Sequence, residues 1–216
     1  MIKALLLDFD GVIVDNEPSF IAAWQHAAQH LQLAWPWPEH ALRGKSLAAL
    51  QPLLLQQWRS QTALTTFLEL SETFWLDQVA RNGLDVMPGV AELLTWLAQT
   101  GMPYALASNS HTTAITRSLS YAGLAGRFPV MVGSDQVSAG KPSPEVFLRA
   151  AQILDVAIGD CLVVEDSATG LTAARHSGGK VAYVGPESQA DSVLRKLSDW
   201  QYPDLTTLCL DLTVLT

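Results

Sequence analysis

Two acidic residues stand directly after the first apolar run of this 216-residue chain, in the segment DFDGVIVDNE. Asp8 and Asp10 are two residues apart, and Gly11 after them permits a sharp turn. In an open α/β sheet, ligands bind beyond the carboxyl ends of the strands. If residues 4–9 form a buried strand, both carboxylates can point into one crevice at its end. A solvated turn at Asp10-Gly11 explains these residues equally well when they are taken alone.

A hydroxyl and an amide follow a second apolar run, in the segment ALASNS. Ser108 and Asn109 come just before a helix that is predicted to begin near Thr112. A hydroxyl beside the free backbone N–H groups of a helix N-terminus forms a cradle for an anion. Both residue types are also common helix N-caps, so this segment alone does not require a ligand.

The segment SAGKPSPEVF contains Lys141, one of only five lysines in the chain. Lys141 precedes a helix predicted to begin near Pro144, and the N-terminus of a helix already carries partial positive charge. A lysine is favourable at that place when an anion lies between it and the helix. A lysine in a solvent-exposed loop is the alternative.

A second acidic pair, Glu165 and Asp166 in VVEDSATG, closes another apolar run. Together with Asp8 and Asp10, the pair gives four carboxyl groups at the ends of predicted strands. Such a cluster needs a cation, because mutual repulsion otherwise raises the pKa values of its members. A site built only from oxygen ligands favours Mg²⁺ over zinc or copper.

The elements that must position these residues alternate between short apolar runs and amphipathic stretches. The predicted strands span residues 4–9, 103–108, 130–133, 160–164 and 180–184. The predicted helices lie near residues 90–99, 112–122, 144–154 and 168–176. Because alternation at this spacing indicates βαβ units, the predicted fold is α/β, with a Rossmann-like parallel sheet and helices on both faces.

The segment from residue 16 to residue 85 departs from this alternation, since it keeps helical spacing and contains no convincing strand. It holds five of the seven tryptophans, which we expect in the core of a small helical bundle rather than stacked on a ligand. The sequence therefore predicts two domains. Residues 1–15 and 86–216 form the Rossmann-like core, and residues 16–85 form a helical domain inserted after the first strand.

Composition limits the partners of the chain. Thirteen basic against 21 acidic residues give a net charge of −8 without any basic run, so nucleic-acid binding is not expected. No apolar run reaches the length of a membrane span, and the N-terminus lacks the features of a signal peptide. Cys161 and Cys209 lie in apolar runs typical of strands, and we expect small buried side chains without a disulfide or zinc site. A cytoplasmic monomer is the expectation.

The four signals follow one another as acid pair, hydroxyl, lysine and acid pair, each at the end of a separate predicted strand. This pattern resembles the haloacid dehalogenase-like superfamily of phosphohydrolases, whose four motifs match DFDG, the serine of ALASNS, the lysine of GKP and the ED pair. The segments MPGV, at residues 87–90, and GKPSPEVF are typical of its β-phosphoglucomutase-like branch. The resemblance covers essentially the whole chain.

The resemblance implies a role for each acid. Asp8 is expected to be the nucleophile that forms an aspartyl-phosphate. Asp10 is expected to protonate the leaving oxygen and then to deprotonate the attacking water. Mg²⁺ is the expected cofactor, held by Asp8, by the backbone carbonyl of Asp10 and by Asp166. Glu165 is expected to reach the metal through water.

The resemblance also implies a binding surface for a small phosphorylated metabolite. Ser108, Asn109 and Lys141 are expected to hold the transferring phosphoryl group, and the helical insertion corresponds to the mobile cap of the family. In the cap, Arg43 and Lys45 of LRGKS match a loop that faces the substrate. The residues expected to bind phosphate or substrate are therefore Gly11, Glu17, Arg43, Lys45, Ser108, Asn109 and Lys141.

The predicted function is a Mg²⁺-dependent phosphatase, and a sugar-phosphate mutase is the main alternative. Mutases of this branch resemble the chain but carry an Arg after the Ser of the cap loop and a His in the first cap helix, where Leu47 and Phe20 stand here. Glu17 is commoner among the phosphatases. Dehalogenases and phosphonatases of the superfamily lack an acidic residue at the position that Asp10 occupies here. A signalling receiver domain would be much shorter, and a non-catalytic binding protein would not need every motif intact. Sugar phosphates, polyol phosphates and 2-phosphoglycolate all stay open as substrates.

Overall fold

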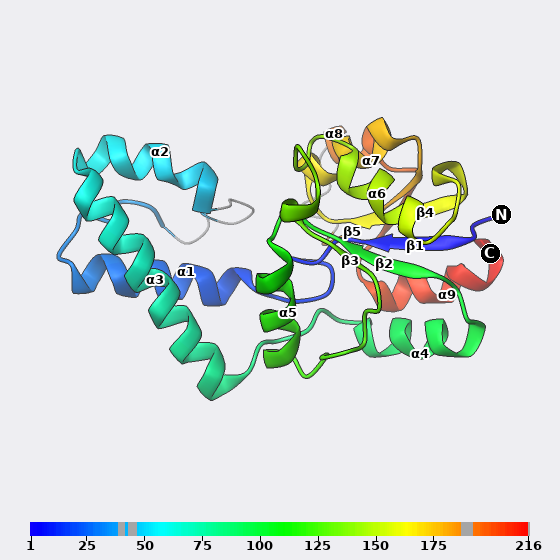
Figure 1. The fold of residues 1–216 in the computed structure, drawn as a ribbon, viewed down its shortest axis with the longest axis horizontal. Helices are drawn as coiled ribbons and strands as arrows, with labels where there is room; N and C mark the ends of the chain where they lie inside the picture. The colour runs from blue at the N-terminus through cyan, green and yellow to red at the C-terminus, as the bar shows by residue number, and fades with distance from the viewer. Residues whose placement is uncertain (39–41, 43–46, 187–191, 216) are drawn as a thin grey trace. The chain divides into compact units, whose positions relative to one another are not determined.

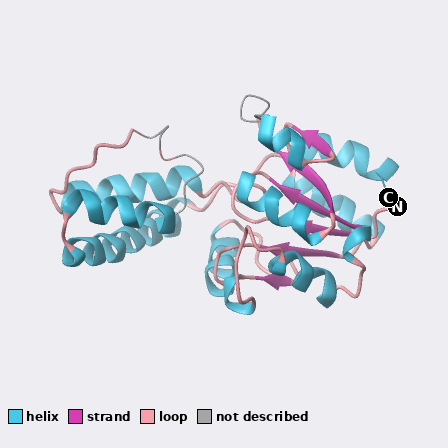
Figure 2. Ribbon diagram, turned by 90° about the horizontal axis from the view of Figure 1, so that it is seen from above, coloured by secondary structure: helices cyan, strands magenta, loops and turns pink. Residues whose placement is uncertain are grey.

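The chain divides into two compact units in the computed structural model, which describes residues 1–38, 42, 47–186 and 192–215 (Figures 1 and 2). One unit, the core, comprises Met1–Val14 and Asp85–Thr216. The other, the inserted unit, comprises Asp15–Leu84. Both junctions lie one residue before the domain boundaries predicted from the sequence.

The core is built on a six-stranded sheet whose strands follow the order β3-β2-β1-β4-β5-β6, with every neighbouring pair parallel. The strands are β1 (Ala4–Leu7), β2 (Tyr104–Ala107), β3 (Met131–Val132), β4 (Cys161–Glu165), β5 (Lys180–Val184) and β6 (Trp200–Tyr202). All five predicted strands are present, and the predicted α/β fold is confirmed. The edge strand β6 was not predicted, because its sequence Trp-Gln-Tyr, in which only Tyr202 is buried, forms no apolar run.

Helices cover both faces of this sheet (Figure 1). One face carries α6 (Glu145–Ile153), α7 (Ala168–Ser177) and α8 (Ser192–Leu197), and the other carries α4 (Val90–Thr100), α5 (Thr112–Tyr121) and α9 (Leu205–Leu215). Two short 3₁₀ helices lie in the connections, η2 (Ser134–Gln136) after β3 and η3 (Ile158–Asp160) before β4. Strands β1 and β4 are buried along their whole length, which explains the unbroken apolar sequence of β1 and the four apolar residues that precede Glu165 in β4.

The winding of the sheet reverses between β1 and β4. From β1 the chain adds β2 and β3 on one side, and it then returns to add β4, β5 and β6 on the other. In such sheets the crevice beyond the carboxyl ends of the strands at the reversal is where ligands bind. Leu7 is in register with Leu106 and with Val164, so the residues that end these three strands lie together.

The inserted unit consists of helices α1 (Glu17–His30), α2 (Leu47–Trp58) and α3 (Gln61–Asn82), and its described residues form no strand. Trp24 and Trp75 are buried. Three further tryptophans are partly buried against the apolar cluster of the bundle: Trp35, Trp37 and Trp58. The tryptophans of this segment therefore serve the packing of the bundle, as the sequence predicted.

The two cysteines are free, and one of them departs from its predicted element. Cys161 is buried in β4 as predicted, whereas Cys209 lies half-buried in helix α9, so its assignment to a strand was wrong. The buried leucines of α9 recur at helical rather than alternating spacing, at Leu205, Leu208 and Leu212. Within the described part of the chain, every helix is too short or too polar to cross a membrane.

Candidate active site

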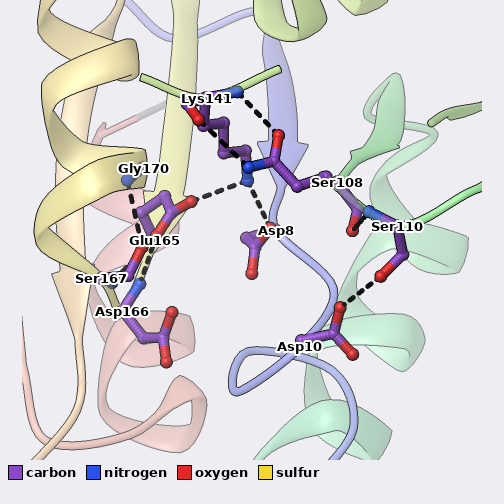
Figure 3. Close-up of polar contacts among 10 residues, drawn as sticks. Asp8, Asp10, Ser108, Ser110, Lys141, Glu165, Asp166, Ser167 and Gly170 are labelled. Carbon is purple, nitrogen blue, oxygen red and sulfur yellow. Dashed lines mark hydrogen bonds and ion pairs between the residues drawn. The ribbon is translucent and has the colours of Figure 1, made fainter. Parts of the chain in front are cut away.

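The first acidic pair lies at the reversal point of the sheet (Figure 3). The backbone N–H of Asp8 donates to the carbonyl oxygen of Val164 at 3.0 Å, which extends the pairing of β1 with β4 by one residue. Asp8 is only 7% exposed. Gly11 has a φ of +86°, and a Cβ atom there would lie 2.1 Å from Oδ2 of Asp166. Glycine is therefore required both for the turn and for the close approach of Asp166 to it.

Lys141 connects the two acidic pairs. Its Nζ atom donates to Oδ1 of Asp8 and, at 2.7 Å, to Oε1 of Glu165, and it lies 4.8 Å from the centroid of the Phe147 ring. Burial alone would lower the pKa of Lys141, but the charges of Asp8 and Glu165 raise it above its ordinary value. The side chain is only 4% exposed. A buried, permanently charged ammonium group thus stands beside Asp8.

Glu165 is fully buried and is held from both of its carboxylate oxygens. Oε1 accepts from Lys141, while Oε2 accepts from the backbone N–H groups of Asp166 and Ser167, each at 2.9 Å, and from Oγ of Ser167 at 3.0 Å. A Cβ atom on Gly170 would lie only 1.6 Å from Oε1, so the glycine in α7 leaves the space for this carboxylate. These contacts fix Lys141 and the start of α7. The expected water-mediated contact of Glu165 with a metal stays a prediction.

Three carboxylates form a group that could hold a metal ion. One oxygen from each of Asp8, Glu165 and Asp166 lies within 4.8 Å of the others. Burial raises the pKa of Asp8 to about 7, and this rise, to which Glu165 and Asp10 add, outweighs the lowering by Lys141. Burial, followed by the charges of Glu165 and Asp8, also raises the pKa of Asp166. Three carboxyl groups thus lie beside a single ammonium group, and their oxygen donors suit Mg²⁺.

The second motif, after β2, supplies a buried hydroxyl group from Ser108 and a clamp, which is the pair of hydrogen bonds from the Asn109 side chain to the backbone of Lys141. Ser108 is 2% exposed, and its Oγ atom accepts from the backbone N–H of Ser110 at 3.0 Å. Oδ1 of Asn109 accepts from the backbone N–H of Lys141 at 2.7 Å, and its Nδ2 donates to the carbonyl oxygen of Lys141 at 3.2 Å. A Cβ atom on Gly140 would lie 2.5 Å from Oδ1 of Asn109. Asn109 thus ties the loop after β2 to the loop that carries Lys141, and its expected contact with a phosphoryl group stays a prediction.

The helix N-terminus beside this motif is capped by the protein itself. His111 accepts from the backbone N–H of Thr113, and Oδ1 of Asp135 accepts from the backbone N–H of Thr112 at 2.8 Å. Oδ2 of Asp135 also accepts from Oγ1 of Thr112 at 2.7 Å. The side chains of Asp135 and His111 therefore take the first donors of α5 that an anion would otherwise use.

Ser110 joins the site although it was not among the predicted site residues. Its Oγ atom donates to Oδ2 of Asp10 at 2.9 Å, and this bond connects residues 100 positions apart (Figure 3). A serine just before a helix is explained locally as a capping residue, so only the spacing of β1 and β2 in the sheet reveals this partner.

Some of the residues predicted to face the substrate from the cap are described in the structure and others are not. Arg43 and Lys45 are outside them, and α2 begins at Leu47, whose side chain is also not described. Glu17 is the first residue of α1. Phe20 stacks on Trp75 with 5.0 Å between ring centroids, so it contributes to the aromatic packing of the bundle. The expected substrate contacts of Glu17, Arg43 and Lys45 stay predictions.

A family model described as haloacid dehalogenase-like hydrolase matches residues 2–178, a range that contains every core motif described above. The chain belongs to this family. The predicted superfamily and the predicted enzyme, a phosphatase-type hydrolase, are confirmed by this match and by phosphatase-named relatives.

Relatives of this hydrolase include phosphatases and mutases. The β-phosphoglucomutase of Bacillus subtilis (strain 168) is 31% identical over 208 residues, which cover 91% of this chain and 91% of that protein. Hexitol phosphatase A of Escherichia coli (strain K12) is 29% identical over 180 residues, which cover 82% of this chain and 80% of that protein. A crystal structure of mutant CbbY from Rhodobacter sphaeroides in complex with xylulose-(1,5)-bisphosphate shares the fold, with a TM-score of 0.80, 21% identity and 96% coverage of both chains.

Proposed function

We propose that this haloacid dehalogenase-like hydrolase is a Mg²⁺-dependent phosphatase that cleaves small phosphorylated metabolites through an aspartyl-phosphate on Asp8. The observation that carries the proposal is the buried ion pair of Lys141 with Asp8 at the reversal point of the sheet. Relatives named hexitol phosphatase A and fructose-1-phosphate phosphatase YqaB support a sugar phosphate or polyol phosphate as substrate.

Attack by Asp8 on a phosphate ester must overcome repulsion between two anions. The Lys141 ammonium donates to Oδ1 of Asp8, so it holds the carboxylate in one orientation and offsets part of that repulsion. Glu165 holds Lys141 from the other side and keeps it at this place. Mg²⁺ held by Asp8, the carbonyl of Asp10 and Asp166 would neutralise further charge on the phosphoryl group. Positioning and electrostatics thus supply most of the catalysis.

Asp10 is assigned the proton transfers of both half-reactions. In the first, its carboxyl proton goes to the ester oxygen while Asp8 forms a bond to phosphorus and the bond from phosphorus to that oxygen breaks. In the second, the Asp10 carboxylate takes a proton from the water that attacks the aspartyl-phosphate. General acid and base catalysis of this kind contributes about 10²–10⁴-fold to the rate. The inserted unit is assigned the role of the family's cap, with Arg43 and Lys45 as substrate contacts.

A panel of phosphate esters tests the proposal. With Mg²⁺ the protein should release phosphate from sugar or polyol phosphates, and EDTA should abolish the release. Asp8→Asn should lose at least about a thousandfold in rate, because the amide is isosteric but not nucleophilic. The matched control is Asp155→Asn, the same change at an exposed residue in a left-handed turn, which asparagine tolerates. Undiminished release by Asp8→Asn would overturn the assignment of the nucleophile.

A sugar-phosphate mutase is the second candidate, favoured by the relative named β-phosphoglucomutase. A mutase must hold a bisphosphate intermediate while the sugar turns around, and Phe20, packed on Trp75, offers no hydrogen bond for this step. We therefore expect inorganic phosphate from β-glucose 1-phosphate supplied with a trace of the 1,6-bisphosphate. A coupled dehydrogenase assay detects glucose 6-phosphate directly. If its formation outpaces phosphate release, the protein is a mutase.

A further inference from the structure

The hydroxyl of Ser110 donates to the side chain that the proposed mechanism uses for proton transfer. We propose that Ser110 is a positioning residue that orients the carboxyl group of Asp10 toward the leaving oxygen, through the 2.9 Å bond from its Oγ atom to Oδ2 of Asp10. This inference rests on the proposed function. It assigns Ser110 no contact with the substrate.

Ser110 is held firmly enough to orient another side chain. Its backbone N–H donates to Oγ of Ser108 at 3.0 Å, and its carbonyl oxygen accepts from the backbone N–H of Ser134 at 3.1 Å. The carbonyl also lies against Gly133, where a Cβ atom would be only 2.6 Å away. The backbone of Ser110 is thus fixed on both sides, which limits its hydroxyl group to the few positions that its rotamers allow.

Asp10 carries a side chain that is less buried than that of Asp8. It follows β1 by three residues, in the turn that Gly11 makes with its φ of +86°. Its side chain is half-exposed, whereas that of Asp8 is buried and ion-paired. A half-exposed carboxyl group samples several rotamers unless a hydrogen bond selects one. The bond from Ser110 favours one rotamer and connects the turn after β1 to the loop after β2 (Figure 3).

The bond engages one carboxyl oxygen of Asp10, and the proposal assigns the proton to the other. A protonated carboxyl group donates from one oxygen and accepts at the other. With Ser110 donating to Oδ2, we assign the proton that Asp10 transfers to Oδ1. As Asp8 bonds to phosphorus, the bond from phosphorus to the ester oxygen breaks and its electron pair stays on that oxygen. The proton on Oδ1 then neutralises the oxygen.

Leaving groups of different basicity separate this role from binding or folding. An alkyl phosphate releases a strongly basic alkoxide and needs the proton, whereas 4-nitrophenyl phosphate releases a stable phenolate without it. The constant kcat/KM reports the steps up to departure of the leaving group, so it isolates the first proton transfer. Ser110→Ala should lower kcat/KM about 10–100-fold for a sugar phosphate that the wild type hydrolyses. For 4-nitrophenyl phosphate the loss should stay within about threefold.

Two further variants serve as controls. Ser110→Thr keeps a hydroxyl group and should restore most of the sugar-phosphate activity. Ser120→Ala removes an exposed hydroxyl that bonds within α5 to the carbonyl of Thr116 at 3.0 Å, and it should leave hydrolysis of both esters unaffected. In an Asp10→Asn background, Ser110→Ala should cause no additional selective loss, because the group that Ser110 orients is already gone.

Each other outcome overturns the inference. An equal fall for both esters would make Ser110 a phosphoryl-binding or structural residue, and unchanged constants for both would deny it any role. An additive loss on top of Asp10→Asn would show that Ser110 acts through another group. If the wild-type protein with Mg²⁺ hydrolyses neither ester, the proposed function is wrong and the inference falls with it. If it hydrolyses both and only the selective loss is absent, the inference alone is wrong.

Discussion

A single methyl group added at Gly170 should disrupt the charge network that holds Asp8 and Lys141. In Gly170→Ala the new Cβ atom would lie 1.6 Å from Oε1 and 1.9 Å from Cδ of Glu165. An ordinary contact needs about 3.5 Å, so the carboxylate would have to move by roughly 2 Å. Such a movement separates Oε1 from Lys141 and Oε2 from the start of α7.

Two opposing contributions determine how far Gly170→Ala changes the free energy of unfolding. Alanine inside α7 gains about 1 kcal/mol over glycine in helix propensity. Displacing one member of a buried, hydrogen-bonded ion pair costs about 3–5 kcal/mol. The second term is larger, so Gly170→Ala should lose about 2–4 kcal/mol in free energy of unfolding. Phosphatase activity should fall at least about tenfold, because Lys141 loses the partner that aligns it with Asp8.

Urea unfolding of the wild type, Gly170→Ala, Glu165→Ala and the double variant measures these two contributions. In a Glu165→Ala background the space is open, so Gly170→Ala should become neutral or stabilising by up to about 1 kcal/mol. Gly159→Ala is the matched control, since Gly159 has no atom within 4 Å of a built Cβ and no positive φ, and it should change stability by less than about 0.5 kcal/mol. If Gly170→Ala is as stable and active as the wild type, Glu165 does not hold Lys141 as described.

Two further predictions concern the clamp and the acidic group. Asn109→Ala removes both side-chain bonds to the backbone of Lys141 and should lower kcat about tenfold with little change in KM; a rise in KM alone would place Asn109 on the phosphoryl group instead. Without metal, the raised pKa values of Asp8, about 7, and Asp166 make the folded protein bind more protons than the unfolded chain. This contribution to stability is present below about pH 4 and is lost as the pH rises through about 7. Mg²⁺ should therefore raise the Tm more at pH 8 than at pH 5, and an equal gain at both pH values would contradict a metal site at these carboxylates.

The sequence predicted the structure well where the residue pattern of a single strand indicates its burial. The apolar runs of β1 and β4 predict burial on both faces, and the candidate site residues follow at their carboxyl ends. In β4, side chains two residues apart share a face, and Val163 packs in the cluster formed with α6 and α7. Glu165 therefore points to the same face. Its contact with Lys141, just before α6, follows from this alternation.

Contacts between separate loops could not be predicted in the same way. The bonds of Ser110 to Asp10 and of Asn109 to Lys141 depend on the relative height of neighbouring strand ends, which no local pattern encodes. Asn109 shows the consequence: an amide beside a phosphate motif predicts a ligand contact, while the structure directs both of its polar atoms to backbone. Cys209 was assigned to the wrong kind of element for a different reason. A short apolar run fits a strand and a buried helix equally well.

Trapping the covalent intermediate tests the central claim most directly. The protein with Mg²⁺ and a substrate is quenched with acid during turnover, reduced with borohydride and analysed by peptide mass spectrometry. Reduction converts an aspartyl-phosphate to homoserine. We expect homoserine at position 8 in the wild type, and none without substrate or in Asp8→Asn. Homoserine at another position, or turnover that persists in Asp8→Asn, would contradict the assignment of Asp8 as the phosphoryl acceptor.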